Sequence, residues 1–174
     1  RDMTVGETLQ LTVTVLPDDA FDKSVTYTIV SGAEFIEMTT WGAVTAKAEG
    51  TVVIKVEAND GSGKSDEVTM NILPVKVTSV TISGAKDIAL GDTLTLSASV
   101  LPDNAANKSV TWSIKSGSDY ATITADGKLT AKAIGTVTVR ATANDGSEKY
   151  AEVKINITAA KVTSVTISGA KDLK

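Results

Sequence analysis

The sequence predicts an all-β chain made of two copies of one β-sandwich, and three observations lead to that prediction. The twelve residues from Lys76 to Asp87 return unchanged from Lys161 to Asp172, so the repeat period is 161 − 76 = 85 residues. Apolar and polar residues alternate in short runs, the pattern of half-buried strands. Gly, Asn, Asp and Pro residues, which favour turns, separate those runs.

The repeat covers the whole chain without an insertion or a deletion, and its turn residues recur in pairs: Gly6 and Gly91, Pro17 and Pro102, Gly42 and Gly127. A unit of this length buries its own core, unlike the short repeats of solenoids. Because Arg1 aligns with Lys86, the first copy starts after its opening strand. The predicted domains are residues 1–74, a repeat lacking its first strand; 75–160, a complete repeat; and 161–174, the first strand of a third repeat.

The first expected strand, residues 7–15, alternates strictly, and its apolar face carries Leu9, Leu11, Val13 and Val15. Pro17 ends it, because proline presets a turn backbone and has no N–H to donate. The next strand spans 24–30, with its copy at 109–115. Each has a large aromatic residue between aliphatic ones, Tyr27 or Trp112, and we expect these rings to fill the cores.

Further strands are expected over 34–38, 44–48, 50–58 and 68–72, with copies over 120–124, 129–133, 135–143 and 153–157. The 50–58 strand is the most regular, and Asn59-Asp60-Gly61 after it is a strong hairpin signal, because these residues tolerate positive φ. We expect Gly50, Gly61, Gly135 and Gly146 at turns. In the invariant stretch, Val77 and Val80 are three apart, which predicts a bulge or a first strand that changes sheets. About seven strands per repeat, with turns every 8–12 residues or so, indicate an immunoglobulin-like sandwich.

Several motifs resemble the bacterial immunoglobulin-like domain, group 2. They are Leu101-Pro102-Asp103, Lys108-Ser-Val-Thr-Trp112-Ser, Ala121-Thr-Ile-Thr, Asp126-Gly-Lys-Leu-Thr-Ala131, Gly135-Thr-Val-Thr-Val139 and the opening Val-Thr-Ser-Val-Thr-Ile. The first repeat departs at Tyr27 and at Thr40-Trp41-Gly42. The resemblance implies non-catalytic modules of bacterial and phage surface proteins, strung together as spacers in adhesins or attached to secreted glycoside hydrolases and virion proteins.

Composition excludes several functions. The net charge is 17 − 21 = −4, with both signs scattered, so nucleic-acid binding loses its main driving force. No apolar run approaches the roughly 20 residues of a membrane helix, so we expect no membrane insertion. Histidine and cysteine are absent, which removes histidine-based triads, thiol nucleophiles and ordinary zinc sites.

The acids offer little chemistry beyond this. Asp18-Asp19 is the best candidate for paired catalytic carboxylates, but its counterpart is Asp103-Asn104, and acids after proline usually form turns. We therefore expect no enzyme and no cofactor. Calcium binding by loop oxygens, near Asp60 or Asp145, stays open. So does an isopeptide bond from Lys47 or Lys132.

Two aromatic residues distinguish the first repeat from the second: Phe21 stands in place of Ala106, and Trp41 in place of Asp126. The alternation of strand directions predicts that both lie at one end of the first repeat. They could stack on a sugar ring or contact a host protein, or they could cover a neighbouring repeat. The second interpretation is favoured, because this end must meet whatever precedes Arg1.

The chain ends suggest an assembly mechanism. A sandwich without its first strand exposes a sheet edge that invites another strand. Residues 162–168 copy the missing strand, with Val162, Val165 and Ile167 as its apolar residues. We therefore predict head-to-tail strand donation between chains, which propagates without closing.

The resulting functional hypothesis is a non-catalytic spacer, an adhesin-like stalk of a bacterial cell-surface or secreted protein, or of a virion surface. Its expected partners are neighbouring immunoglobulin-like repeats. The alternative is a module that binds carbohydrate or a host ligand through Phe21 and Trp41.

Overall fold

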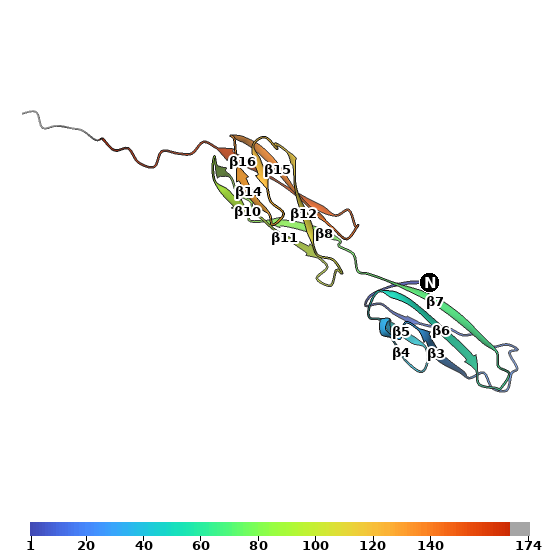
Figure 1. Cartoon of the computed structure of the whole chain (residues 1–174). Coiled ribbons are helices and arrows are strands. Elements are labelled where there is room, and N and C mark those ends of the chain that lie inside the picture. The colour runs from blue at the N-terminus through green and yellow to red at the C-terminus, as the bar shows by residue number, and fades with distance from the viewer. Residues whose placement is uncertain (168–174) are drawn as a thin grey trace, which may run out of the picture. The chain divides into compact units, whose positions relative to one another are not determined.

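The computed structural model describes residues 1–167, and it divides the chain into a first unit, Arg1–Val75, and a second unit, Lys76–Lys174. Each unit is a sandwich of β-sheets (Figure 1). No α-helix occurs within residues 1–167; the one helical element described is the 3₁₀ turn η1 (Ala33–Phe35). The all-β, tandem immunoglobulin-like fold class predicted from the sequence is confirmed.

Two sheets form the first unit. One has the order β1 (Asp2–Thr4), β7 (Ser65–Leu73), β6 (Gly50–Ala58), β3 (Val25–Ser31), with β1 parallel to β7 and the other pairs antiparallel. The other has the order β2 (Thr8–Gln10), β5 (Ala43–Ala46), β4 (Ile36–Met38). The hairpin predicted at Asn59-Asp60-Gly61 joins β6 to β7.

The second unit repeats both sheets and adds a pair. Its sheets are β12 (Val110–Ser116), β15 (Gly135–Ala143), β16 (Tyr150–Thr158), β9 (Ile88–Ala89); and β10 (Thr93–Thr95), β14 (Lys128–Ala131), β13 (Ala121–Ile123). The added pair is β8 (Ser79–Ser83) with β11 (Ser97–Leu101). The spacing of Val77 and Val80 predicted a bulge or a change of sheet; the chain does change sheets, but only after Ser83, because β8 pairs with β11 whereas β9 pairs with β16.

Each unit buries its own aliphatic core between its sheets. The alternation in β6 and β15 has the predicted effect: Val52 and Ile54 are buried in one unit, Val137 and Val139 in the other. Tyr27 and Trp112 pack against these cores and are themselves half-buried. Burial of apolar side chains is the main favourable contribution to folding.

Three expectations about the elements were wrong in detail. The run 7–15 is not one strand: its copy forms β10 and β11, which belong to different sheets, and in the first unit only β2 forms. Residues 34–38 begin as the η1 turn, so only Ile36–Met38 are extended. Gly50 and Gly135 begin strands β6 and β15, as the expected strand 50–58 implies, so the expectation that they lie at turns was wrong.

A ring contact explains these two strand glycines. A Cβ on Gly50 would lie 2.5 Å from the Phe35 ring, and one on Gly135 would lie 2.7 Å from the Tyr120 ring. The aromatic side chains therefore lie directly on the glycine backbone, and any residue with a Cβ in place of the glycine would clash with the ring. The sequence reasoning missed this pair, although the aligned aromatics Phe35 and Tyr120 were the available signal.

Candidate functional site

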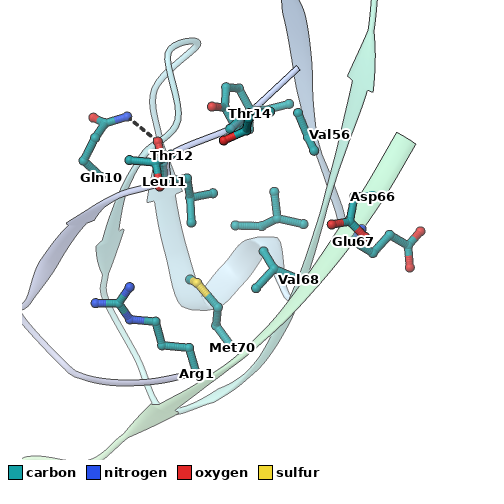
Figure 2. Close-up of a pocket in the computed structure, with 13 residues that line it drawn as sticks. Arg1, Gln10, Leu11, Thr12, Thr14, Val56, Asp66, Glu67, Val68 and Met70 are labelled. Carbon is teal, nitrogen blue, oxygen red and sulfur yellow. Dashed lines mark hydrogen bonds between the residues drawn. The ribbon is translucent and has the colours of Figure 1, made fainter. Parts of the chain in front are cut away.

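The most distinctive surface feature is a groove in the first unit, of about 440 Å³. Residues Gln10–Thr14 form one wall, and β7 forms the other through Asp66, Glu67, Val68 and Met70. Figure 2 shows Leu11 and Val68 directed toward the space between the walls. The lining combines apolar side chains, among them Leu11, Val56 and Val68, with polar and charged ones.

The groove continues into a second hollow of about 200 Å³, lined by Val13–Leu16 on one side and Lys64–Asp66 on the other. The two hollows share Val13, Thr14, Val56 and Asp66. We call the combined feature the strand groove, defined as the trough between residues 10–16 and 64–70.

The second unit has a strand where the first unit has this groove. Residues 97–101, which correspond to 12–16, form β11 and pair antiparallel with β8. β8 also lies against β15 and β16, the counterparts of β6 and β7. Ile82 of β8 packs on the main core, and Val80 packs on a smaller cluster around Val77 and Val100.

The absence of such a strand changes the burial of the matching residues. Ala141 and Ala143 are buried in the second unit, whereas Val56 and Ala58 are only half-buried in the first. Val13 is 37% exposed. The first unit thus presents apolar surface that its copy covers.

The backbone beside the groove also differs. Residues 11–15 are in no strand, whereas their counterparts include most of β11. Within the described part of the chain, the amides and carbonyls of residues 12–16 make no backbone hydrogen bond. Unpaired backbone groups along a sheet edge are a template for an added strand.

A carboxylate anchors the start of the added strand in the second unit. Asp145 accepts hydrogen bonds from the Val77 N–H and, at 3.0 Å, from the Ser147 N–H. The bonds from Ser147 and then from Val77 lower the pKa of Asp145 to about 2.

Asp60, the counterpart in the first unit, has only half of this arrangement. Its Oδ1 accepts from the Ser62 N–H at 2.9 Å, and this serine lowers the pKa of Asp60. Within residues 1–167, Asp60 Oδ2 has no hydrogen-bond donor. The hairpin motif Asn-Asp-Gly predicts a turn at both acids but gives no sign of the anchoring role of Asp145.

The tail residues singled out from the sequence lie away from both cores. Val162, Val165 and Ile167 are 81%, 85% and 88% exposed, and residues 159–167 belong to no strand. Residues 168–174 of the predicted third-repeat strand lie outside the described part of the chain.

The two aromatic candidates are fully or mostly exposed, Phe21 at 107% and Trp41 at 69%. They lie on separate turns. Phe21 follows the turn in which the Ala20 N–H donates to the Pro17 carbonyl. Trp41 is in the β4–β5 turn, where its carbonyl accepts from Gln10 Nε2 at 2.8 Å.

Other candidate chemistry finds little support in the described residues. They contain no cluster of three or more acidic side chains that could hold a metal ion. Asp18 and Asp19 are exposed, and Lys47 pairs with Glu37 at the surface, 2.6 Å apart. No helix in residues 1–167 has the length and apolar character needed to cross a membrane.

A family model and several relatives match this chain. The model of the bacterial Ig-like domain (group 2) matches residues 3–68 and again 76–153. An Ig-like virion protein of Serratia phage KSP90 is 36% identical over 83% of this chain and 57% of its own length. The tail tube protein pb6 of Escherichia phage T5 is 41% identical over 56% of this chain and 24% of its own. Among solved structures, the S-layer protein SbsC aligns with a TM-score of 0.45 at 18% identity, covering 86% of this chain and 22% of that one.

Proposed function

Because the chain belongs to the bacterial Ig-like domain (group 2) family, we propose that it is a non-catalytic structural spacer. It would serve as an adhesin-like stalk in a bacterial cell-surface or secreted protein, or in a virion-surface protein. The names of the two phage relatives support a place on a particle or outside a cell.

The observation that carries this proposal is the in-register duplication of a whole sandwich. Each copy has its own buried core, so the chain gains length by adding independent units. The residues that both copies keep include core residues such as Val52 and Val137 and turn residues such as Gly61 and Gly146. A spacer needs these properties and no reactive pocket.

The spacer role can be tested by placing the chain between a membrane anchor and an epitope on a bacterial surface. We expect a bulky antibody to reach the epitope with both units present and to reach it less well when the second unit is removed. An unrelated sandwich pair of equal length should restore access. Failure of that replacement would show that the chain contributes more than length.

We further propose that copies join head to tail by strand donation. The strand groove offers unpaired backbone and apolar side chains, and residues 161–167 are exposed and unpaired in the structure. A shortened chain that ends at Thr158 should lose self-association in sedimentation equilibrium. Equal association of the short and full chains would disprove donation.

A carbohydrate- or host-ligand-binding module is the second candidate, favoured by the exposure of Phe21 and Trp41. Exposed aromatic rings are suited to stacking on sugars and partner surfaces. If the chain is only a spacer, the natural chain and the variants Phe21→Ala and Trp41→Ala should all give background signals on a glycan array. A signal that either substitution removes would establish the ligand-binding role instead of the spacer role alone.

A further inference from the structure

The second unit shows in detail how a strand occupies the groove position. β8 runs antiparallel to β11, with Val80 opposite Val100 and Ile82 opposite Ala98. The apolar side chains of β8 contact the cores, whereas Thr81 between them is exposed. This alternation is the ordinary two-residue period of a strand.

The tail contains the same residues in the same order. Residues 161–167 read Lys-Val-Thr-Ser-Val-Thr-Ile, identical to residues 76–82. Adding the repeat period to the β8 residues and subtracting it from the β11 residues gives the equivalent pairing of residues 164–167 with residues 13–16. Because a slip of one residue would turn the valine and isoleucine side chains outward, the apolar groove favours one register.

Building on the strand donation proposed above, we propose that the strand groove is a register-specific binding site for residues 161–167 of a second copy. In this site the segment runs antiparallel to residues 12–16. Val165 lies opposite Val15, Ile167 lies opposite Val13, and the Val162 N–H donates to Asp60.

The groove matches that occupant at both ends. Val56 and Ala58 are half-buried, whereas their counterparts Ala141 and Ala143 are buried. The first unit therefore has accessible apolar surface that Val165 and Ile167 can cover. At the hairpin end, Asp60 Oδ2 is unpaired within residues 1–167, whereas the matching oxygen of Asp145 binds the Val77 N–H. A charged acceptor for a backbone N–H is a strong, directional anchor.

The register is tested with cysteine pairs, because the natural chain contains no cysteine. Under mild oxidation, the variant Val15→Cys with Val165→Cys should form disulfide-linked oligomers on a non-reducing gel. The matched control, Val15→Cys with Thr166→Cys, places the second thiol on the opposite face and should stay monomeric. Equal cross-linking of both pairs would overturn the proposed register.

Charge substitutions test the face. Val165→Asp puts a charge into the groove and should weaken self-association about tenfold or more in sedimentation equilibrium. Thr166→Asp carries the same charge on the outer face and should associate like the natural chain. Both residues are exposed in the structure and outside every strand, so folding of the two units is unaffected. Equal weakening by the two variants would contradict the inference.

The anchor is tested by Asp60→Ala, with Asp19→Ala as the control acid. We expect Asp60→Ala to weaken self-association several-fold and Asp19→Ala to leave it unchanged. Unchanged association of Asp60→Ala would show that Asp60 does not anchor the segment.

These experiments distinguish failure of strand donation from failure of the register-specific site. Association that survives removal of residues 159–174 disproves donation itself, whereas association that needs the tail but cross-links in either register disproves only the specific site.

Discussion

A single carboxylate links the hairpin of the second unit to its first strand. Asp145 lies just after β15 and accepts the N–H of Val77, which is 2% exposed and precedes β8. Without this acceptor, the Val77 N–H would be partly buried and unpaired, which costs free energy. The same side chain orders the turn through Ser147.

Replacing Asp145 with Ala should therefore lower the Tm of the second unit, and the loss should depend on pH. The folded pKa is about 2, below the ordinary aspartate value of 3.8, so the stabilisation is fully present above about pH 4 and is lost as pH falls through 2. Thermal unfolding of both proteins from pH 5 to pH 2 measures this. The gap between the curves should close toward pH 2, and a gap independent of pH would refute the charged anchor.

The contact between Tyr120 and Gly135 gives a second residue-level prediction. Gly135→Ala should destabilise the second unit by about 1–3 kcal/mol, because its Cβ would lie 2.7 Å from the ring. Urea unfolding measures the loss. In a Tyr120→Ala background the same substitution should cost much less, as expected for residues in contact. An equal cost in both backgrounds would place the strain elsewhere.

At the scale of the element, identical patterns gave different structures. The run 7–15 and its copy share their alternation of apolar residues, yet only the copy pairs as β11. A strand forms when its backbone has a partner, and β8 supplies one in the second unit only. Periodicity describes one strand at a time, so it could not reveal this difference.

Amide exchange should display the same difference. We expect residues 12–16 to exchange quickly, whereas residues 97–101 should be protected by their pairing with β8. Hydrogen exchange followed by mass spectrometry resolves the two segments. Equal protection in dilute solution would mean that residues 12–16 are already paired, and the groove would then be closed.

Most other elements could be predicted from the sequence, because their signals are local. Alternation located β6 and β15, and Asn-Asp-Gly located their hairpins. The spacing of Val77 and Val80 left a bulge or a change of sheet open, and the change from β8 to β9 lies after Ser83. The open edge of the first unit followed from its missing first strand, whereas the Asp145 anchor joins residues 68 positions apart in the chain, which no local pattern carries. The contact of the Tyr120 ring with Gly135 was missed although both repeats have an aromatic residue at this position, Phe35 and Tyr120.

At the scale of the whole molecule, the units are separate sandwiches, so damage to one core should leave the other intact. Trp112→Ala removes a ring that packs on the core of the second unit and should cost about 3 kcal/mol there. Unfolding followed by hydrogen exchange should show an earlier transition for residues 76–158 and an unchanged one for residues 1–75. A matching shift of both transitions would indicate one cooperative unit.

The most direct test of the account is a titration of the chain ending at Thr158 with a synthetic peptide of residues 161–167. If the first unit holds an open strand site, its unfolding transition should rise steadily with peptide concentration by mass action. The second unit, whose site β8 already fills, should not respond, and a peptide carrying Val165→Asp should have no effect. A first-unit transition that stays constant, or that responds equally to the altered peptide, would contradict the account.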